Sequence, residues 1–171
     1  MSPPSKPSMA GNEPQPSSEG PLQFGRRQPG LTYIDRPSAF GIAAREDGRL
    51  ALVKVERPEG TWRDLPGGAL DPGEDEPAAL VREFGEETGL VVRCGALIAR
   101  ADQYFVKSDG APVNNRSGVH LAELAGEDPS LKIEHDHTLE WWDPAAAIGA
   151  LRHDSHAWAA AAWMRLGRRV P

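Results

Sequence analysis

Short apolar runs separated by turn residues organise the first half of the chain. In SAFGIAAREDGRLALVKV, residues 38–55, two such runs flank Asp47-Gly48, a dipeptide typical of a tight turn between antiparallel strands. The polar segment SDGAPVNNRSG, residues 108–118, is predicted to be a loop. Four further apolar segments are predicted to be strands: Leu90–Arg100, Gln103–Val106, Gly118–Leu124 and Leu139–Trp142.

One segment between these strands has the period of a helix. It is predicted to begin after Asp75 as N-cap, to carry Pro77 in its first turn and to end at Gly89. Its apolar residues, Phe84 among them, share a side that can pack on a sheet. Gly85 in the middle costs the helix about 1 kcal/mol relative to alanine, which we attribute to close packing.

Two more helices are predicted near the C-terminus. Asp143-Pro144 resembles a helix start and predicts a short helix over Ala145–Leu151, and SHAWAAAAWMRLGRR predicts a longer one capped by Ser155. Strands interspersed with helices indicate the α/β class, with a mixed sheet between helical layers.

The first 30 residues differ in composition from the rest. They contain seven Pro, five Ser and four Gly, with few apolar residues that could be buried. Such a segment is predicted to be a disordered tail, so the folded domain is predicted to span residues 31–171 and to begin near Thr32.

The excess of negative over positive charge arises in one stretch of the chain. Residues 68–90 contain seven acidic side chains and one basic side chain, Arg82, whereas the rest of the chain carries 18 of each sign. The net charge of −6 therefore arises in 23 residues, which indicates a cation site rather than a generally acidic surface. This balance also argues against a basic face for nucleic acid.

Three of these acidic residues crowd one face of the predicted helix. Glu83, Glu86 and Glu87 fall within an arc of about 100°. Each like-charge pair at such spacings destabilises an isolated helix by about 0.2–0.5 kcal/mol. A bound cation would offset this repulsion, and a solvated acidic face is the alternative.

The single cysteine and the absence of long apolar runs limit the class of protein. Cys94 cannot form an internal disulfide and fits a reducing compartment, so a cytoplasmic protein is expected. Its apolar surroundings favour a buried residue over a nucleophile. No stretch approaches the roughly 18 apolar residues that span a membrane.

The glycine loop and the helix together match the pattern G-x5-E-x7-R-E-U-x-E-E-x-G-U, where U is a bulky apolar residue. This pattern resembles the Nudix box of MutT-like hydrolases, and every fixed position is filled: Gly68, Glu74, Arg82, Glu83, Phe84, Glu86, Glu87, Gly89 and Leu90. The resemblance implies the Nudix fold, an α/β/α sandwich with a central mixed sheet. It also implies hydrolysis of the phosphoanhydride bond in a nucleoside diphosphate linked to another group, with Mg²⁺ or Mn²⁺ as cofactor.

The resemblance implies roles for individual residues. Glu83, Glu86 and Glu87 resemble metal ligands, and the main-chain carbonyl of Gly67 resembles a further one. Arg82 and Glu74 resemble an ion pair that shapes the loop and orients the glutamates, while Gly68 and Gly89 belong to the structural frame. The catalytic set is then Glu83, Glu86 and Arg82, although the general base could also lie on a later loop.

Many members of the family add an acidic residue before a late tryptophan. The stretch IEHDHTLEWW offers Glu134, Asp136 and Glu140, of which Glu134 is the first choice as a metal ligand. We interpret the four histidines at 135, 137, 153 and 156 as surface residues rather than transition-metal ligands.

Other residues are candidates for substrate binding. Trp62 and Tyr104 could stack a base, and His120 could line the cleft, although each could equally be a packing residue. The expected partner is a small nucleotide-like molecule rather than nucleic acid or a membrane, and the resemblance also allows a homodimer.

Two other functions compete with hydrolysis. A non-catalytic nucleotide-binding module on the same fold could lose box carboxylates, but this box has kept all of them. An isomerase of isoprenoid diphosphates would need a catalytic cysteine that Cys94 does not resemble. The sequence leaves oxidised nucleotides, ADP-ribose, nucleotide sugars and dinucleotides open as substrates.

Overall fold

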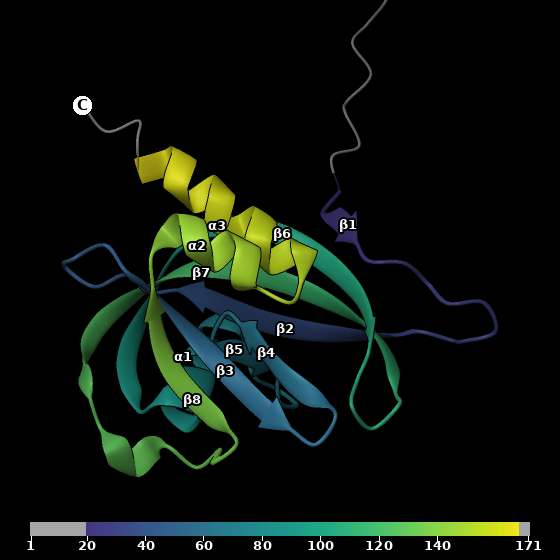
Figure 1. Cartoon of the computed structure of the whole chain (residues 1–171), viewed down its shortest axis with the longest axis horizontal. Coiled ribbons are helices and arrows are strands. Elements are labelled where there is room, and N and C mark those ends of the chain that lie inside the picture. The colour runs from purple at the N-terminus through teal and green to yellow at the C-terminus, as the bar shows by residue number, and fades with distance from the viewer. Residues whose placement is uncertain (1–19, 168–171) are drawn as a thin grey trace, which may run out of the picture.

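The computed structural model describes residues 20–167 (Figure 1). These residues form two sheets and three α-helices. Their elements follow the order β1 (Leu22–Phe24), β2 (Ile34–Ile42), β3 (Leu50–Arg57), β4 (Gly60–Asp64), β5 (Gly67–Ala69), α1 (Glu76–Thr88), β6 (Leu90–Val106), β7 (Pro112–Glu127), the 3-10 helix Pro129–Leu131, β8 (His137–Trp142), α2 (Pro144–Ala150) and α3 (Asp154–Gly167).

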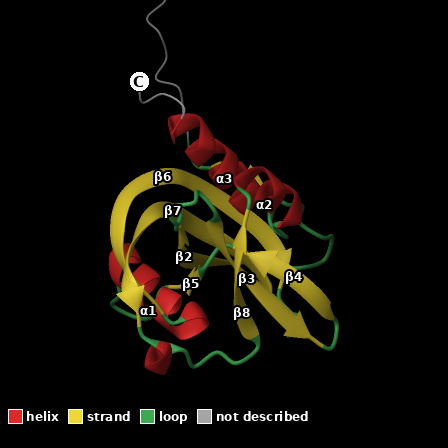
Figure 2. Cartoon of the chain, turned by 60° about the vertical axis from the view of Figure 1, so that its left-hand side comes forward, coloured by secondary structure: helices red, strands yellow, loops and turns green. Residues whose placement is uncertain are grey.

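The larger sheet is mixed, as the α/β class predicts. Its strand order is β1-β6-β7-β2-β5, in which β1 pairs parallel with β6 and β2 pairs parallel with β7, while the other pairs are antiparallel. The smaller sheet, β4-β3-β8, is antiparallel. Helix α1 lies within the curve of β6 and β7, and α2 and α3 cover the opposite side (Figure 2).

Alternation along β2 shows how one strand serves both helical layers. Ala39 and Ala43, the residue directly after β2, are fully buried on the side of α1, in one core cluster with Phe84. Phe40 and Ile42 belong to the other cluster, with two alanines of α3. Because successive side chains of a strand point to opposite faces, this two-sided burial gives a continuous apolar run.

The turn at Asp47-Gly48 forms, but the predicted hairpin is wrong beyond its tip. The Arg45 main-chain N–H donates a hydrogen bond of 3.0 Å to the Arg49 carbonyl, and Gly48 has a φ of 80°. After the bridge between Ala44 and Leu50, the two strands enter different sheets, β2 beside β5 and β7 and β3 beside β4 and β8. The sheets therefore separate next to this turn.

The predicted ends of α1 are confirmed. The Asp75 side chain accepts a hydrogen bond of 2.9 Å from the Ala78 N–H, and Gly89 ends the helix with a φ of 76°. A Cβ atom on Gly85 would lie 3.3 Å from the Leu131 side chain, so this glycine does permit close packing.

The segment 108–118 is not one loop, which corrects the prediction. Strand β7 begins at Pro112 and is paired along its length with β6, which itself runs unbroken from 90 to 106 with register shifts. Two polar residues near the start of this strand, Asn114 and Asn115, are buried, and side-chain hydrogen bonds satisfy them. Asn114 bonds Asp35 at 3.1 Å, and Asn115 accepts from Arg36 at 3.1 Å.

Both termini of the described region differ from the predictions. Order begins before Thr32, because Leu22–Phe24 pairs with residues 101–103; residues 1–19 of the predicted tail lie outside the described residues. Ser155 does not cap α3, which begins at Asp154; its main-chain N–H donates to Gln103 Oε1 at 3.2 Å instead. No helix within residues 20–167 is long and apolar enough to cross a membrane.

Candidate active site

A cleft opens where the two sheets separate, and α1 forms one of its walls. Its volume is about 260 Å³, and both sheets, α1, α3 and three loops contribute to it. The side chains that line it fall into acidic, basic and aromatic groups. They include Arg36, Phe40, Arg57, Trp62, Asp64, Glu83, Glu87, Phe105, Lys107, Glu134, His137, Arg152, His153 and His156.

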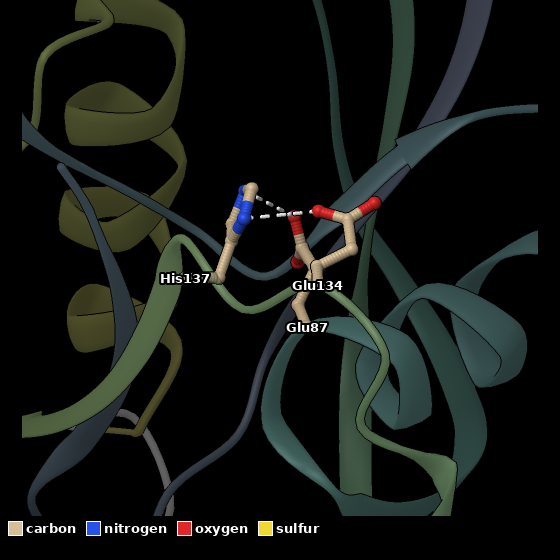
Figure 3. Close-up of side chains that lie close together, drawn as sticks. All are labelled: Glu87, Glu134 and His137. Carbon is tan, nitrogen blue, oxygen red and sulfur yellow. Dashed lines mark ion pairs between the residues drawn. The ribbon is translucent and has the colours of Figure 1, made fainter. Parts of the chain in front are cut away.

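The acidic face of α1 meets a second acidic element at this cleft. Glu83, Glu86 and Glu134 each offer a carboxylate oxygen within 4.8 Å of the others. Glu87, Glu134 and His137 form a second group within the same limit, and the three side chains point toward one another (Figure 3). Glu134 belongs to both groups, so the loop before β8 closes the cluster that the helix begins.

Two glycines let the main chain approach this cluster. The Gly67 N–H donates a hydrogen bond of 2.9 Å to Glu87 Oε2, with a backbone φ of 135° that other residues rarely adopt. A Cβ atom on Gly68 would lie 2.6–2.8 Å from the Glu83 carboxylate. A side chain at Gly68 would therefore displace Glu83, whereas a side chain at Gly67 would collide with the main chain of β2 at Ala39 and Phe40.

Arg82 is the predicted partner of Glu74, and it also holds two of the glutamates. Its guanidinium donates to both oxygens of Glu74 at 3.0 and 2.9 Å, to Glu83 at 2.9 Å and to Glu86 at 3.2 Å. A further bond of 3.0 Å reaches the carbonyl of Ala69. The guanidinium of Arg82 therefore connects the loop at Ala69 and Glu74 to helix α1 and holds the side chains of Glu83 and Glu86 in position.

Lys132 fixes the second acidic element. Its ammonium donates to three main-chain carbonyls, those of Glu87 at 2.9 Å, Glu134 at 2.6 Å and His137 at 2.7 Å. One of these belongs to the end of α1, where a cation is favourable. The loop that carries Glu134 and His137 is thereby attached directly to the glutamate helix.

The electrostatics of the cluster suit a hard divalent cation. Burial raises the pKa of Glu87 well above its ordinary value, and the carboxylates of Glu83 and Glu134 raise it further. Burial also raises the pKa of Glu83, although Arg82 opposes this. Mg²⁺ and Mn²⁺ bind carboxylate oxygens, and such an ion would compensate the crowding. Glu83, Glu86, Glu87 and Glu134 could hold it.

His137 is oriented by the same carboxylates. Its Nδ1 lies 2.9 Å from both Glu134 and Asp136, and its Nε2 lies 3.4 Å from Glu87. Burial alone would lower the pKa of His137, but the hydrogen bonds and charges of Glu134 and Asp136 outweigh it and raise this pKa. The same hydrogen bond lowers the pKa of Glu134.

Basic residues occupy other parts of the wall. Arg36 donates to Asn115 at 3.1 Å, and burial lowers its pKa while the charge of Glu83 opposes this. Arg57 holds Asp136 at 3.0 Å and Ser108 at 3.0 Å. A cleft with carboxylates on one side and guanidinium groups on another can hold a metal together with phosphates.

The candidates for substrate binding separate into two groups. Trp62 lines the cleft, whereas Tyr104 and His120 lie elsewhere, which corrects the prediction. The Tyr104 ring packs against Tyr33 at a centroid distance of 5.2 Å, and His120 Nε2 lies 2.8 Å from Glu76. Their polar and aromatic atoms are thus used in packing between strands and helix.

Glu140 and Asp136, the alternatives to Glu134, are engaged in ion pairs. Glu140 binds Arg63 at 2.7 Å and accepts from the Trp142 indole, and Asp136 binds Arg57. Of the three, Glu134 alone is in the groups of residues that could hold a metal.

The interpretation of the histidines as surface residues is wrong for three of them. The side chains of His137, His153 and His156 are only 10%, 7% and 2% exposed, and all three line the cleft. The spacing of Glu134 and His137 could have indicated that they meet. No local pattern links His153 and His156 to Asp64, which lies about 90 residues earlier.

Comparisons with known proteins agree with this geometry. The NUDIX domain model matches residues 35–165. The chain is 38% identical over 113 residues to an RNA pyrophosphohydrolase from Sphingopyxis alaskensis, a match covering 60% of this chain and 71% of that protein. It is 49% identical over 60 residues to a putative 8-oxo-dGTP diphosphatase from Bacillus subtilis, covering 35% of this chain and 39% of that protein.

Solved structures share the fold. A MutT protein from Methanosarcina mazei Go1 superposes with a TM-score of 0.63 at 20% identity, over 81% of this chain and 99% of that one. A NUDIX hydrolase from Nitrosomonas europaea gives 0.62 at 20% identity, over 81% and 93%. With the domain matched across 131 of 171 residues and the box glutamates facing a cleft, the chain belongs to the Nudix hydrolase family, which acts on pyrophosphate bonds of nucleotide derivatives.

Proposed function

We propose that the protein is a divalent-metal-dependent hydrolase that breaks a pyrophosphate bond in a nucleoside diphosphate linked to another group. Glu83, Glu86, Glu87 and Glu134 would hold Mg²⁺ or Mn²⁺, and the carbonyl of Gly67 is a further candidate ligand. The basic residues of the cleft would bind the phosphates.

The meeting of Glu134 with the helix carries this proposal. Three carboxylates on one helix could be a solvated face, as the sequence alone allows. Glu134 comes from a separate loop, yet it offers a ligand atom to both groups within 4.8 Å. Lys132 holds that loop in place through three carbonyls, which supports a site that is formed before any ligand binds.

The chemistry divides among the residues of the cleft. Hydrolysis forms a bond from a water oxygen to one phosphorus and releases the bridging oxygen with the other phosphate. When bound, a divalent ion would neutralise phosphate charge and polarise the water. Glu83 lines the cleft and has a raised pKa, so it is our candidate to receive the proton of that water. Arg82 would keep Glu83 and Glu86 in position.

A substrate panel tests the proposal. The panel contains ADP-ribose, a nucleotide sugar, a dinucleotide, 8-oxo-dGTP and an RNA with a 5′-triphosphate. The last two are included because relatives are named as an 8-oxo-dGTP diphosphatase and an RNA pyrophosphohydrolase. Each is incubated with Mg²⁺, with Mn²⁺ and with a chelator, and the products are identified by chromatography. We expect cleavage at a phosphoanhydride that the chelator abolishes.

Binding without cleavage of any substrate with either metal would contradict the proposal and favour a nucleotide-binding module. Cleavage of RNA would contradict the expectation that nucleic acid is excluded, without affecting the proposed chemistry. Mn²⁺ titration by calorimetry gives a second readout, in which Glu134→Gln should weaken binding and Asp128→Asn, on the exposed 3-10 turn, should not.

A further inference from the structure

A recess in the cleft lies beside the carboxylate cluster and has its own chemistry. Asp64, at the end of β4, faces Arg152 and His153 from the loop before α3 and His156 from α3 itself. Rings of Phe40 and Phe105 pack on the two imidazoles at centroid distances of 4.3 and 4.7 Å. The recess is therefore aromatic at its sides and carries one buried carboxylate.

One oxygen of that carboxylate is unsatisfied. Arg152 Nη2 lies 3.1 Å from Asp64 Oδ2. Within the described part of the chain, Oδ1 is buried and has no hydrogen-bond partner. His156 Nδ1 lies 3.6 Å and His153 Nε2 3.9 Å from this oxygen, both beyond hydrogen-bond distance. An unpaired buried carboxylate oxygen is costly, so it indicates a donor that is supplied from outside.

The two imidazole nitrogens cannot supply that donor. His156 Nδ1 accepts the buried N–H of Leu65 at 3.4 Å, which leaves it no proton to give. The guanidinium of Arg152 can only donate, so His153 Nε2 must accept at the observed 2.9 Å. Burial lowers the pKa of His153 to about 3, so this ring is neutral. Oδ1 and His153 Nε2 are thus two neighbouring acceptors for an incoming donor, the second of which becomes free when Arg152 leaves.

Arg152 shows which shape of donor fits these acceptors. Its Nη2 lies 3.1 Å from Asp64 Oδ2 and 2.9 Å from His153 Nε2, while the planar guanidinium lies over the Trp62 ring at 4.8 Å. Its side chain is 34% exposed, whereas the imidazoles are almost fully buried. Its main chain is held by a 2.8 Å bond to Arg63, so the side chain can leave while the loop stays.

We propose that this recess binds the donor edge of a guanine-type base, which replaces the Arg152 guanidinium and satisfies Asp64. The N1–C2–N2 unit of guanine is itself a planar guanidine with adjacent N–H donors. Adenine and cytosine place a ring-nitrogen acceptor beside their amino group, and that lone pair would face the acceptors Asp64 Oδ1 and His153 Nε2. The inference rests on the proposed function, because the base would belong to the nucleotide part of the substrate.

Mononucleotide binding in the presence of a chelator tests this without hydrolysis. GMP, IMP and AMP share their sugar and phosphate, and GMP differs from IMP only by the 2-amino group. NMR titration of the full chain should give GMP an affinity about tenfold above IMP and AMP, since a hydrogen bond to a charged group is lost. Equal affinities for the three would overturn the proposal.

Two variants locate the selectivity. Asp64→Asn removes the negative charge and replaces one acceptor oxygen by an N–H donor, so the preference for GMP should fall to within about twofold while a thermal melt verifies folding. Arg152→Ala removes the group that occupies the recess, so the preference should remain or increase. A preference that survives Asp64→Asn, or disappears with Arg152→Ala, contradicts the role of Asp64.

Hydrolysis of the substrate panel is measured separately, so the two proposals can fail independently. Metal-dependent cleavage with no preference among the mononucleotides would overturn the recess and leave the hydrolase. A preference for GMP without cleavage of any substrate would overturn the hydrolase and leave the recess.

Discussion

Glu87→Gln should make the metal-free protein more stable and the metal-loaded enzyme much slower. Glu87 is almost fully buried, and one of its carboxylate oxygens lies no more than 4.8 Å from one of Glu134. Two unit charges at that separation repel by about 3.5 kcal/mol at an effective dielectric of about 20. The Gly67 N–H and His137 offset much of this, so we expect a net gain of about 1 kcal/mol from removing the charge.

The gain should depend on pH in a defined direction. The pKa of Glu87 is raised in the folded state. As the pH rises, this carboxyl therefore loses its proton in the unfolded chain, near the ordinary pKa of 4.5, before it does so in the folded chain. The wild type therefore loses stability above that pH, whereas the glutamine variant does not. The melting temperature of the variant should exceed that of the wild type by about 2–4 °C at pH 8 and match it near pH 4.

Mg²⁺ should reverse this order. Binding to the folded state stabilises the wild type, and the variant lacks one ligand. Turnover should fall about 100-fold or more, equivalent to about 2.7 kcal/mol of transition-state stabilisation. Thermal melts with and without Mg²⁺ and turnover are measured for the wild type and for Glu87→Gln. The control variant is Glu123→Gln, which removes an exposed charge. A metal-free loss of stability with activity retained would refute the metal-site reasoning.

Three other variants test the frame around the cluster. Arg82→Ala should reduce turnover more than tenfold with the fold intact in circular dichroism, because Glu83 loses the guanidinium that holds it in position; retention of over a tenth refutes this. Lys132→Met should weaken Mn²⁺ affinity in calorimetry by about tenfold, because the Glu134 loop is released, and Lys132→Arg should restore part of it. Gly68→Ala should reduce turnover at least tenfold without a fall in the metal-free melting temperature; unchanged turnover would show that Glu83 tolerates the contact.

The helix and its glycine loop could be predicted closely because their determinants are local. Asp75, Gly89 and the 3.6-residue period specify α1 without reference to the rest of the chain. The hairpin was predicted only in part, since the turn at Gly48 is local whereas the pairing of β2 with β7 joins residues about 80 apart. The polar start of β7 lacked an apolar signal because side-chain hydrogen bonds, rather than apolar contacts, bury it.

The residues of the site likewise divide into those that a local pattern predicts and those that meet only in the folded chain. The glutamates of α1 follow from one spacing, and Glu134 from a resemblance. The recess could not be predicted, because Asp64 and His156 meet only after β4 and α3 pack together. Neither the burial of His153 nor the packing of Tyr104 against Tyr33 can be seen in a local pattern of the sequence.

The separation of the two sheets places the hydrolytic and selective parts on different segments. Carboxylates come from α1 and the loop at 132–137, whereas the recess comes from β4 and residues 152–156. Substitutions in the second set can change which molecule is admitted while the bond-breaking apparatus stays intact. Descendants of one ancestral hydrolase could in this way acquire different substrate specificities. The same few recess positions could be varied in the laboratory to change the substrate specificity of this enzyme.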